Sequence, residues 1–187
     1  MNTFVVIAMS VTSLLGQSLA LAQMPGGGTT ETALALCQQS DQFSGTEKQD
    51  VLTRGLELAQ AAVEANPSDA RAHFAVFCNL GKKIQSRTLG LGDLREIDRL
   101  RAEIDTALAL APNDTEAMVA KGAMLLELPW FLGGDRRRGE ELLCTALNHE
   151  PANRAARRYL VEAVKAHGGD EVTEPRQVCS TADPHHG

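Results

Sequence analysis

Aromatic side chains are scarce in this sequence. Of its 187 residues, one is Trp, one is Tyr and five are Phe, whereas apolar residues as a whole make up 43%. Alanine and leucine supply most of the apolar surface, a composition that favours closely packed helices over sheets. A chain of this length can bury a core without the help of a metal or a cofactor. We expect one all-α domain.

Motifs of the common enzyme classes are also missing. The chain contains no GxSxG, no HExxH, no P-loop and no dinucleotide-binding fingerprint. No cysteine pair has CxxC spacing, and His185 and His186 lie near Cys179 and Asp183 without the spacing of a closed metal site. We therefore expect a protein without catalytic activity, cofactor or metal.

Positive charge is in deficit. The sequence has 18 Lys and Arg residues against 24 Asp and Glu residues, which gives a net charge of -6. Because phosphate binding needs a basic face, nucleic acid is excluded as an expected partner.

The N-terminal residues are predicted to be an export signal. An apolar run from Phe4 to Leu15 is followed by Ala20-Leu21-Ala22, a small-x-small cleavage site. No Lys or Arg precedes the run, so a buried helix or an uncleaved anchor is the alternative. We expect residues 1–22 to be removed and residues 23–29, which include three consecutive glycines, to form a flexible linker. The mature chain is then periplasmic or secreted, without a stable membrane span.

Three prolines divide the rest of the chain. Ala stands five residues before and five residues after each of Pro67, Pro112 and Pro151, and an aliphatic residue stands four before. A proline ends one helix and permits the next to start, with Ser68 and Asp135 as two expected N-caps. The apolar spacing predicts helices at about 30–42, 44–65, 68–84 and 93–111, then from Pro112 to about 128, at 135–150, and from Pro151 to about 167. Residues 30–169 would form the helical domain and residues 170–187 a C-terminal tail.

This pattern resembles the tetratricopeptide repeat (TPR), whose unit is a helical hairpin of about 34 residues. Gly122 stands where that repeat has a small residue in its first helix. The spacings between the prolines, 45 and 39 residues, are longer than the repeat, and we place the excess in loops around 87–92 and 129–134. The resemblance implies a TPR-like right-handed stack of about three helical hairpins.

Residues 128–135, Leu-Pro-Trp-Phe-Leu-Gly-Gly-Asp, carry a narrower resemblance. Together with Gly139 and Ala146-Leu147 they are similar to the T component of tripartite ATP-independent periplasmic (TRAP) transporters, a bacterial family of exported TPR-like proteins. The regulator-of-microtubule-dynamics proteins share a similar turn, so this motif follows the fold more than the function. The resemblance implies an accessory protein near the cell envelope, and it transfers no catalytic residue.

Trp130 and Phe131 are candidate binding residues. With Leu132 they form a large apolar group between a proline and a glycine, within a predicted loop. One interpretation is a rim that contacts a ligand or a partner. The interpretation that we favour is that these side chains pack into the groove between neighbouring hairpins.

Three consecutive arginines open the predicted helix at 135–150. Cations at a helix N-terminus are unfavourable, so something must compensate for Arg136, Arg137 and Arg138. A docking site for an acidic partner or a small carboxylate ligand would use Arg136 and Arg137. A solvated charge run, offset by acidic residues nearby in the sequence, is the alternative that we favour.

Four cysteines follow the predicted cleavage site. An even count after an export signal indicates two disulfides, although four cysteines allow three connectivities, and four buried thiols are an alternative. In a stack of hairpins the first helices contact one another, which places Cys37 beside Cys78. A tail that returns along the last hairpin brings Cys179 to Cys144. We therefore predict the pairs Cys37–Cys78 and Cys144–Cys179.

The expected function is that of a non-catalytic protein-interaction scaffold in the periplasm or cell envelope. The alternative is an accessory protein of a solute transporter that binds a small organic acid. The first hypothesis implies a protein partner, and the second implies a carboxylate ligand.

Overall fold

The computed structural model of the protein describes residues 28–87, 93–166 and 179. Within this part of the chain every regular element is a helix, which confirms the all-α prediction, and no helix there is long and apolar enough to cross a membrane. The α-helices are α1 (Thr29–Gln39), α2 (Gly45–Ala65), α3 (Ala70–Gln85), α4 (Asp93–Leu110), α5 (Thr115–Glu127), α6 (Arg136–His149) and α7 (Arg154–Lys165). Two 3-10 turns accompany them, η1 (Ser40–Gln42) after α1 and η2 (Trp130–Leu132) before α6.

The two ends of the chain are largely outside this description. The predicted signal peptide at 1–22 and the predicted tail at 170–187, apart from Cys179, lie outside the described residues, as does most of the predicted linker. At the end of that linker, Gly28 is the N-cap of α1.

Acidic and amide side chains cap the helices that follow the turns. The Asp135 carboxylate accepts a hydrogen bond from the backbone N–H of Arg138, as the sequence predicts. The expected cap Ser68 is wrong by one residue. Ser68 lies inside a turn that the backbone N–H of Asp69 closes on the carbonyl of Asn66, so Asp69 is the first residue placed to cap α3. Side chains also cap α5 and α7, from Asp114 and Asn153.

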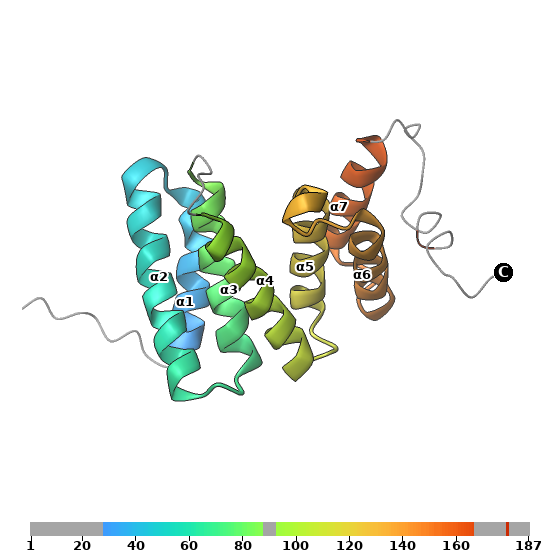
Figure 1. Cartoon of the computed structure of the whole chain (residues 1–187). Coiled ribbons are helices and arrows are strands. Elements are labelled where there is room, and N and C mark those ends of the chain that lie inside the picture. Colours follow the sequence, from blue (N-terminus) through green and yellow to red (C-terminus); the bar gives the residue numbers. More distant parts are fainter. Residues whose placement is uncertain (1–27, 88–92, 167–178, 180–187) are drawn as a thin grey trace, which may run out of the picture.

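The helices pack mainly against their neighbours in the chain (Figure 1). Helix α1 contacts α2 and α3, and α3 contacts α4, whereas α5 contacts α6 and α7. Helix α5 belongs to both groups. Its Ala117, Met124 and Leu125 join the larger core, which α1 to α4 also form, and its Met118 and Val119 join a smaller core with α6 and α7.

Side chains also link α3 to α5 near both ends of these helices. Arg71 Nη1 lies 3.3 Å from Glu116 Oε2, and Arg71 Nε lies 3.4 Å from a carboxylate oxygen of Glu31 in α1. At the other end, Gln85 Nε2 donates to Glu127 Oε2 at 3.1 Å. Exposed ion pairs of this kind contribute less than about 1 kcal/mol each. Ala117, Met124 and Leu125 of α5 also pack into the larger core, so apolar contacts join the two groups as well.

Two glycines bring α5 and α6 close together. A Cβ atom built on Gly122 would lie 3.0 Å from the backbone oxygen of Gly139, and a Cβ on Gly139 would lie 2.9 Å from the oxygen of Gly122. Leu143 is fully buried beside this crossing. Because the two backbones are nearly in contact, the start of α6 is held in a defined position beside the middle of α5.

The cysteines form the two pairs that the sequence analysis expects. Cys37 is joined to Cys78, which connects α1 to α3, and Cys144 of α6 is joined to Cys179. Disulfides form and persist in oxidising compartments. The two bonds therefore indicate an oxidising, extracytoplasmic environment.

Candidate functional site

The loop between α5 and α6, which we call the aromatic loop (residues 129–134), is closed by its own backbone. The carbonyl of Pro129 accepts hydrogen bonds from the N–H groups of Leu132, at 2.9 Å, and Gly134, at 3.0 Å. The N–H of Asp135 then donates to the carbonyl of Leu125 in α5, at 3.0 Å. The loop is thus a compact turn tied to the last turn of α5.

Both glycines of this loop are required by its geometry. Gly133 has a φ angle of +88°, and a Cβ built on it would lie 2.6 Å from the guanidinium carbon of Arg101 in α4. A Cβ on Gly134 would lie 1.8 Å from the carbonyl oxygen of Leu128, closer than any real contact. A side chain at either position would change the loop, so the glycines fix how it displays its aromatic residues.

Trp130 and Phe131 point into solvent. Their exposed fractions are 84% and 67%, and their rings meet edge to face with centroids 5.9 Å apart. The favoured prediction that they pack between hairpins is therefore wrong, and only Leu132 packs against the core. A 3-10 turn has three residues per turn, so three consecutive side chains point in three directions and only one faces inward.

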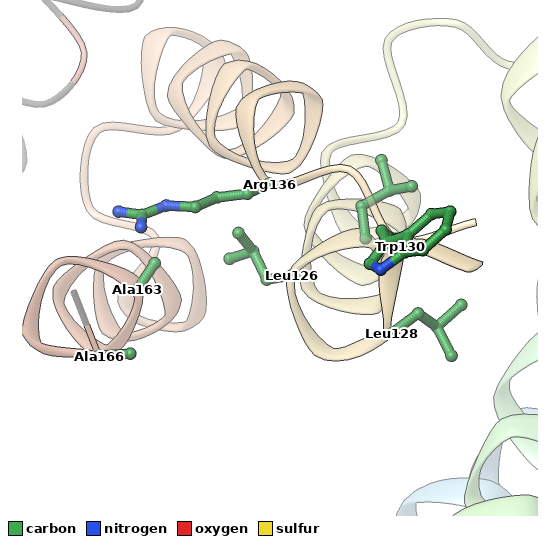
Figure 2. Close-up of a pocket in the computed structure, with 8 residues that line it drawn as sticks. Leu126, Leu128, Trp130, Arg136, Ala163 and Ala166 are labelled. Atoms are coloured by element: carbon green, nitrogen blue, oxygen red, sulfur yellow. The ribbon is translucent and has the colours of Figure 1, made fainter. Parts of the chain in front are cut away.

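A pocket of about 250 Å³ lies beside Trp130 (Figure 2). It forms where the end of α5, the aromatic loop, the first residue of α6 and the end of α7 meet. In Figure 2, Leu126 lies between Trp130 and Arg136, and the Arg136 side chain extends toward α7. The lining residues are Leu125, Leu126, Leu128, Trp130, Gly134, Arg136, Ala163 and Ala166.

The arginines at the start of α6 are paired with acids one turn later. Arg136 Nε donates to Glu140 Oε1 at 2.7 Å, and Arg137 Nη1 donates to Glu141 Oε1 at 2.8 Å. The interpretation that nearby acids offset this charge run is confirmed for both residues. Their surroundings differ, however, because Arg136 lines the pocket, whereas the Arg137 side chain is 77% exposed and lies outside the lining.

Four residues were predicted as binding residues, and the structure brings three of them together. Trp130 and Arg136 line one pocket, and Phe131 packs on Trp130, whereas Arg137 is separate. Sequence reasoning missed the aliphatic part of the pocket. Ala163 of α7 and Ala166, the C-cap of that helix, follow the aromatic loop by about 30 positions, and no local pattern marks them as neighbours of it.

Glu127 stands between the pocket residues Leu126 and Leu128 in the sequence, and its carboxyl group has a raised pKa. Partial desolvation raises the pKa of Glu127 above its ordinary value, and the nearby carboxylate of Glu162 adds to this effect. The hydrogen bond from Gln85 and the charge of Arg158 act in the opposite direction.

The histidines offer no site of their own within the described part of the chain. His73 is buried, with Nδ1 2.7 Å from Glu103 Oε2 and Nε2 2.9 Å from the carbonyl oxygen of Pro67. The described residues contain no group of three or more potential metal ligands, and the predicted tail residues His185 and His186 lie outside them.

The pocket is lined mainly by apolar side chains. Of its eight lining residues only Arg136 is ionisable, and a guanidinium does not exchange protons near neutral pH. No protein-family model matches the chain, and comparison with curated proteins found no match. The exposed aromatic pair and the adjacent pocket are therefore the features on which a function can be based.

Proposed function

We propose that this protein is an exported, non-catalytic, TPR-like scaffold that binds a protein partner in the periplasm or the extracellular space through its aromatic loop. The observation that carries the proposal is the exposure of Trp130 and Phe131 on a loop that two glycines hold in one shape. Aromatic residues are enriched at protein interfaces and often dominate binding energy. A fixed loop also loses little entropy when it binds.

Two further observations support the other parts of the proposal. The contacts of α1 with both α2 and α3, and of α5 with both α6 and α7, support the stacked-hairpin part of the proposal. The two disulfides favour an exported protein, in line with the apolar run and the cleavage site at the N-terminus. The periplasm and the extracellular space are both oxidising, so the disulfides fit either compartment.

A paired substitution tests the role of the loop. Trp130→Ala combined with Phe131→Ala should reduce capture of the protein's main partner from the envelope or secreted fraction more than tenfold, since each lost aromatic anchor removes about 1 kcal/mol or more. The stability of this variant should change by less than about 0.5 kcal/mol, because both side chains are exposed.

The matched control replaces exposed apolar residues outside the loop. Leu94 and Leu110 of α4 have exposed fractions of 49% and 42%. Leu94→Ala with Leu110→Ala should leave capture unchanged. Equal capture by the wild type and the loop variant, measured by quantitative mass spectrometry, would rule out the loop as the binding surface.

A second candidate function, binding of a small organic acid as an accessory of a solute transporter, is favoured by one observation. The guanidinium of Arg136 stands beside an apolar pocket. That pocket, at about 250 Å³, is smaller than the roughly 300–1,000 Å³ of most small-molecule sites. Arg136-dependent thermal stabilisation by free organic acids would support this candidate, and its absence would remove it.

A further inference from the structure

We infer that the pocket beside Trp130 receives one aliphatic side chain of the partner, and that Arg136 binds an aspartate or glutamate close to that side chain in the partner's chain. This inference rests on the proposed function and specifies the chemistry of the partner.

The walls of the pocket select an aliphatic group. Three leucines and two alanines form most of the lining, and Trp130 forms one edge. A volume of about 250 Å³ is suited to a single side chain of the size of leucine or methionine. Moving such a side chain out of water strengthens binding by about tenfold or more. Trp130 is the lining residue that also belongs to the exposed aromatic pair.

Arg136 provides a positioned charge at this pocket. Its Nε is bound to Glu140, whose side chain is mostly buried, so the guanidinium is held in place. No other residue of the described chain bonds to its two terminal nitrogens. Arginine donates from several nitrogens at once and forms charge-assisted hydrogen bonds with carboxylates. Charge complementarity therefore favours an acidic residue next to the aliphatic anchor.

Arg137 is a natural control for Arg136. Both residues lie in the first turn of α6 and each is paired with a glutamate four positions later. Only Arg136 lines the pocket, and Arg137 is twice as exposed, at 77% against 37%. Removal of either charge changes the net charge of the protein by the same amount. A difference between the two variants thus reports on position and not on charge alone.

The test uses a phage-displayed library of random twelve-residue peptides, selected on the disulfide-bonded protein and counter-selected on its Trp130→Ala variant. We expect the selected peptides to contain Leu, Ile or Met within four positions of Asp or Glu. One such peptide and its amide counterpart, with Gln or Asn in place of the acid, are then titrated against the protein. Trp130 is the only tryptophan in the sequence, so its fluorescence reports binding at the pocket directly.

The expected pattern is a thermodynamic cycle. The acidic peptide should bind the wild type and Arg137→Gln about tenfold more tightly than the amide peptide does, and Arg136→Gln should remove that difference. Equal affinities of the two peptides for the wild type, equal effects of the two arginine variants, or a selection that yields no Trp130-dependent peptide would each overturn the inference. If partner capture still depends on Trp130 and Phe131, the proposed function survives that result.

Discussion

The first group of helices, α1 to α4, and the second group, α5 to α7, differ in the interactions that hold their helices together. Between α1 and α3 several bonds converge on one short stretch of backbone. Cys37 is bonded to Cys78, Lys82 Nζ lies 3.0 Å from the carbonyl oxygen of Cys37, and Asn79 Nδ2 donates to the carbonyl of Ala33 at 3.0 Å. The contact between α1 and α3 therefore combines a disulfide, hydrogen bonds and apolar packing.

Among the residues that the structure describes, the group formed by α5, α6 and α7 has fewer such bonds. Its core is smaller, and the approach of α5 to α6 depends on Gly122 and Gly139. Its loop leaves Trp130 and Phe131 in solvent, and its helix ends leave a pocket open. On the proposed function the two groups divide the roles: the first provides a stable support, and the second provides the surface that binds the partner.

Removal of the disulfides should produce the largest change. Cys37→Ser with Cys78→Ser removes a bond between residues with a sequence separation of 41. Because the unfolded chain then gains loop entropy, the free energy of unfolding should fall by about 4 kcal/mol. The separation of Cys144 and Cys179 is 35, so their removal should cost slightly less. Urea unfolding of both double variants measures this. A clearly larger loss for the second bond would contradict the view that the first group is the main support.

A methyl group at the crossing of α5 and α6 should have the next largest effect. Gly122→Ala places a Cβ 2.8 Å from Leu143 Cγ and 3.0 Å from the backbone of Gly139, so the helices must move apart at a cost of about 1–3 kcal/mol. Gly81→Ala in α3 is the control, because its Cβ meets only Leu100, at 3.4 Å. Since alanine favours helix, this variant should be neutral or more stable by up to about 1 kcal/mol. Equal destabilisation by both substitutions would argue against the special role of the crossing.

The smallest effects should depend on pH and have opposite signs in the two groups. The hydrogen bond from Lys82 lowers the pKa of Asp41 from its ordinary value of 3.8, against an opposing effect of burial. Ionised Asp41 therefore stabilises the fold above that value, and this contribution is lost as the pH falls through the lower folded pKa. For Glu127 the pKa is raised, so ionisation disfavours the fold as the pH rises through and above 4.5.

Two variants measure this contrast by urea unfolding between pH 3 and pH 7. At pH 7, Asp41→Asn should be less stable than the wild type, and Glu127→Gln should be equally stable or slightly more stable. The change at Asp41 should stay below about 1 kcal/mol, because its side chain is largely exposed. Both differences should shrink toward pH 3. Shifts of the same sign at pH 7 would contradict the contrast.

Much of the helical framework was predictable from the sequence. Pro67 and Pro112 mark the points where one helix ends and another begins, and α2 ends at Ala65 as expected. The pair Cys37–Cys78 followed from the order of the helices, and the pair Cys144–Cys179 followed from the expected return of the tail. The exposure of the Trp130 side chain could not be predicted in this way. It depends on which residue of the 3-10 turn faces the core, and apolar composition does not determine that. The pocket was hidden for another reason, since its α5 and α7 walls are distant in the chain.

The contact between Gly133 and the guanidinium of Arg101 has a mechanical consequence. The aromatic loop belongs to the second group of helices, yet a side chain of α4, in the first group, supports it directly. A force applied to the loop is therefore shared by both groups. On the proposed function, a partner bound to the loop would restrain the position of the two groups relative to one another.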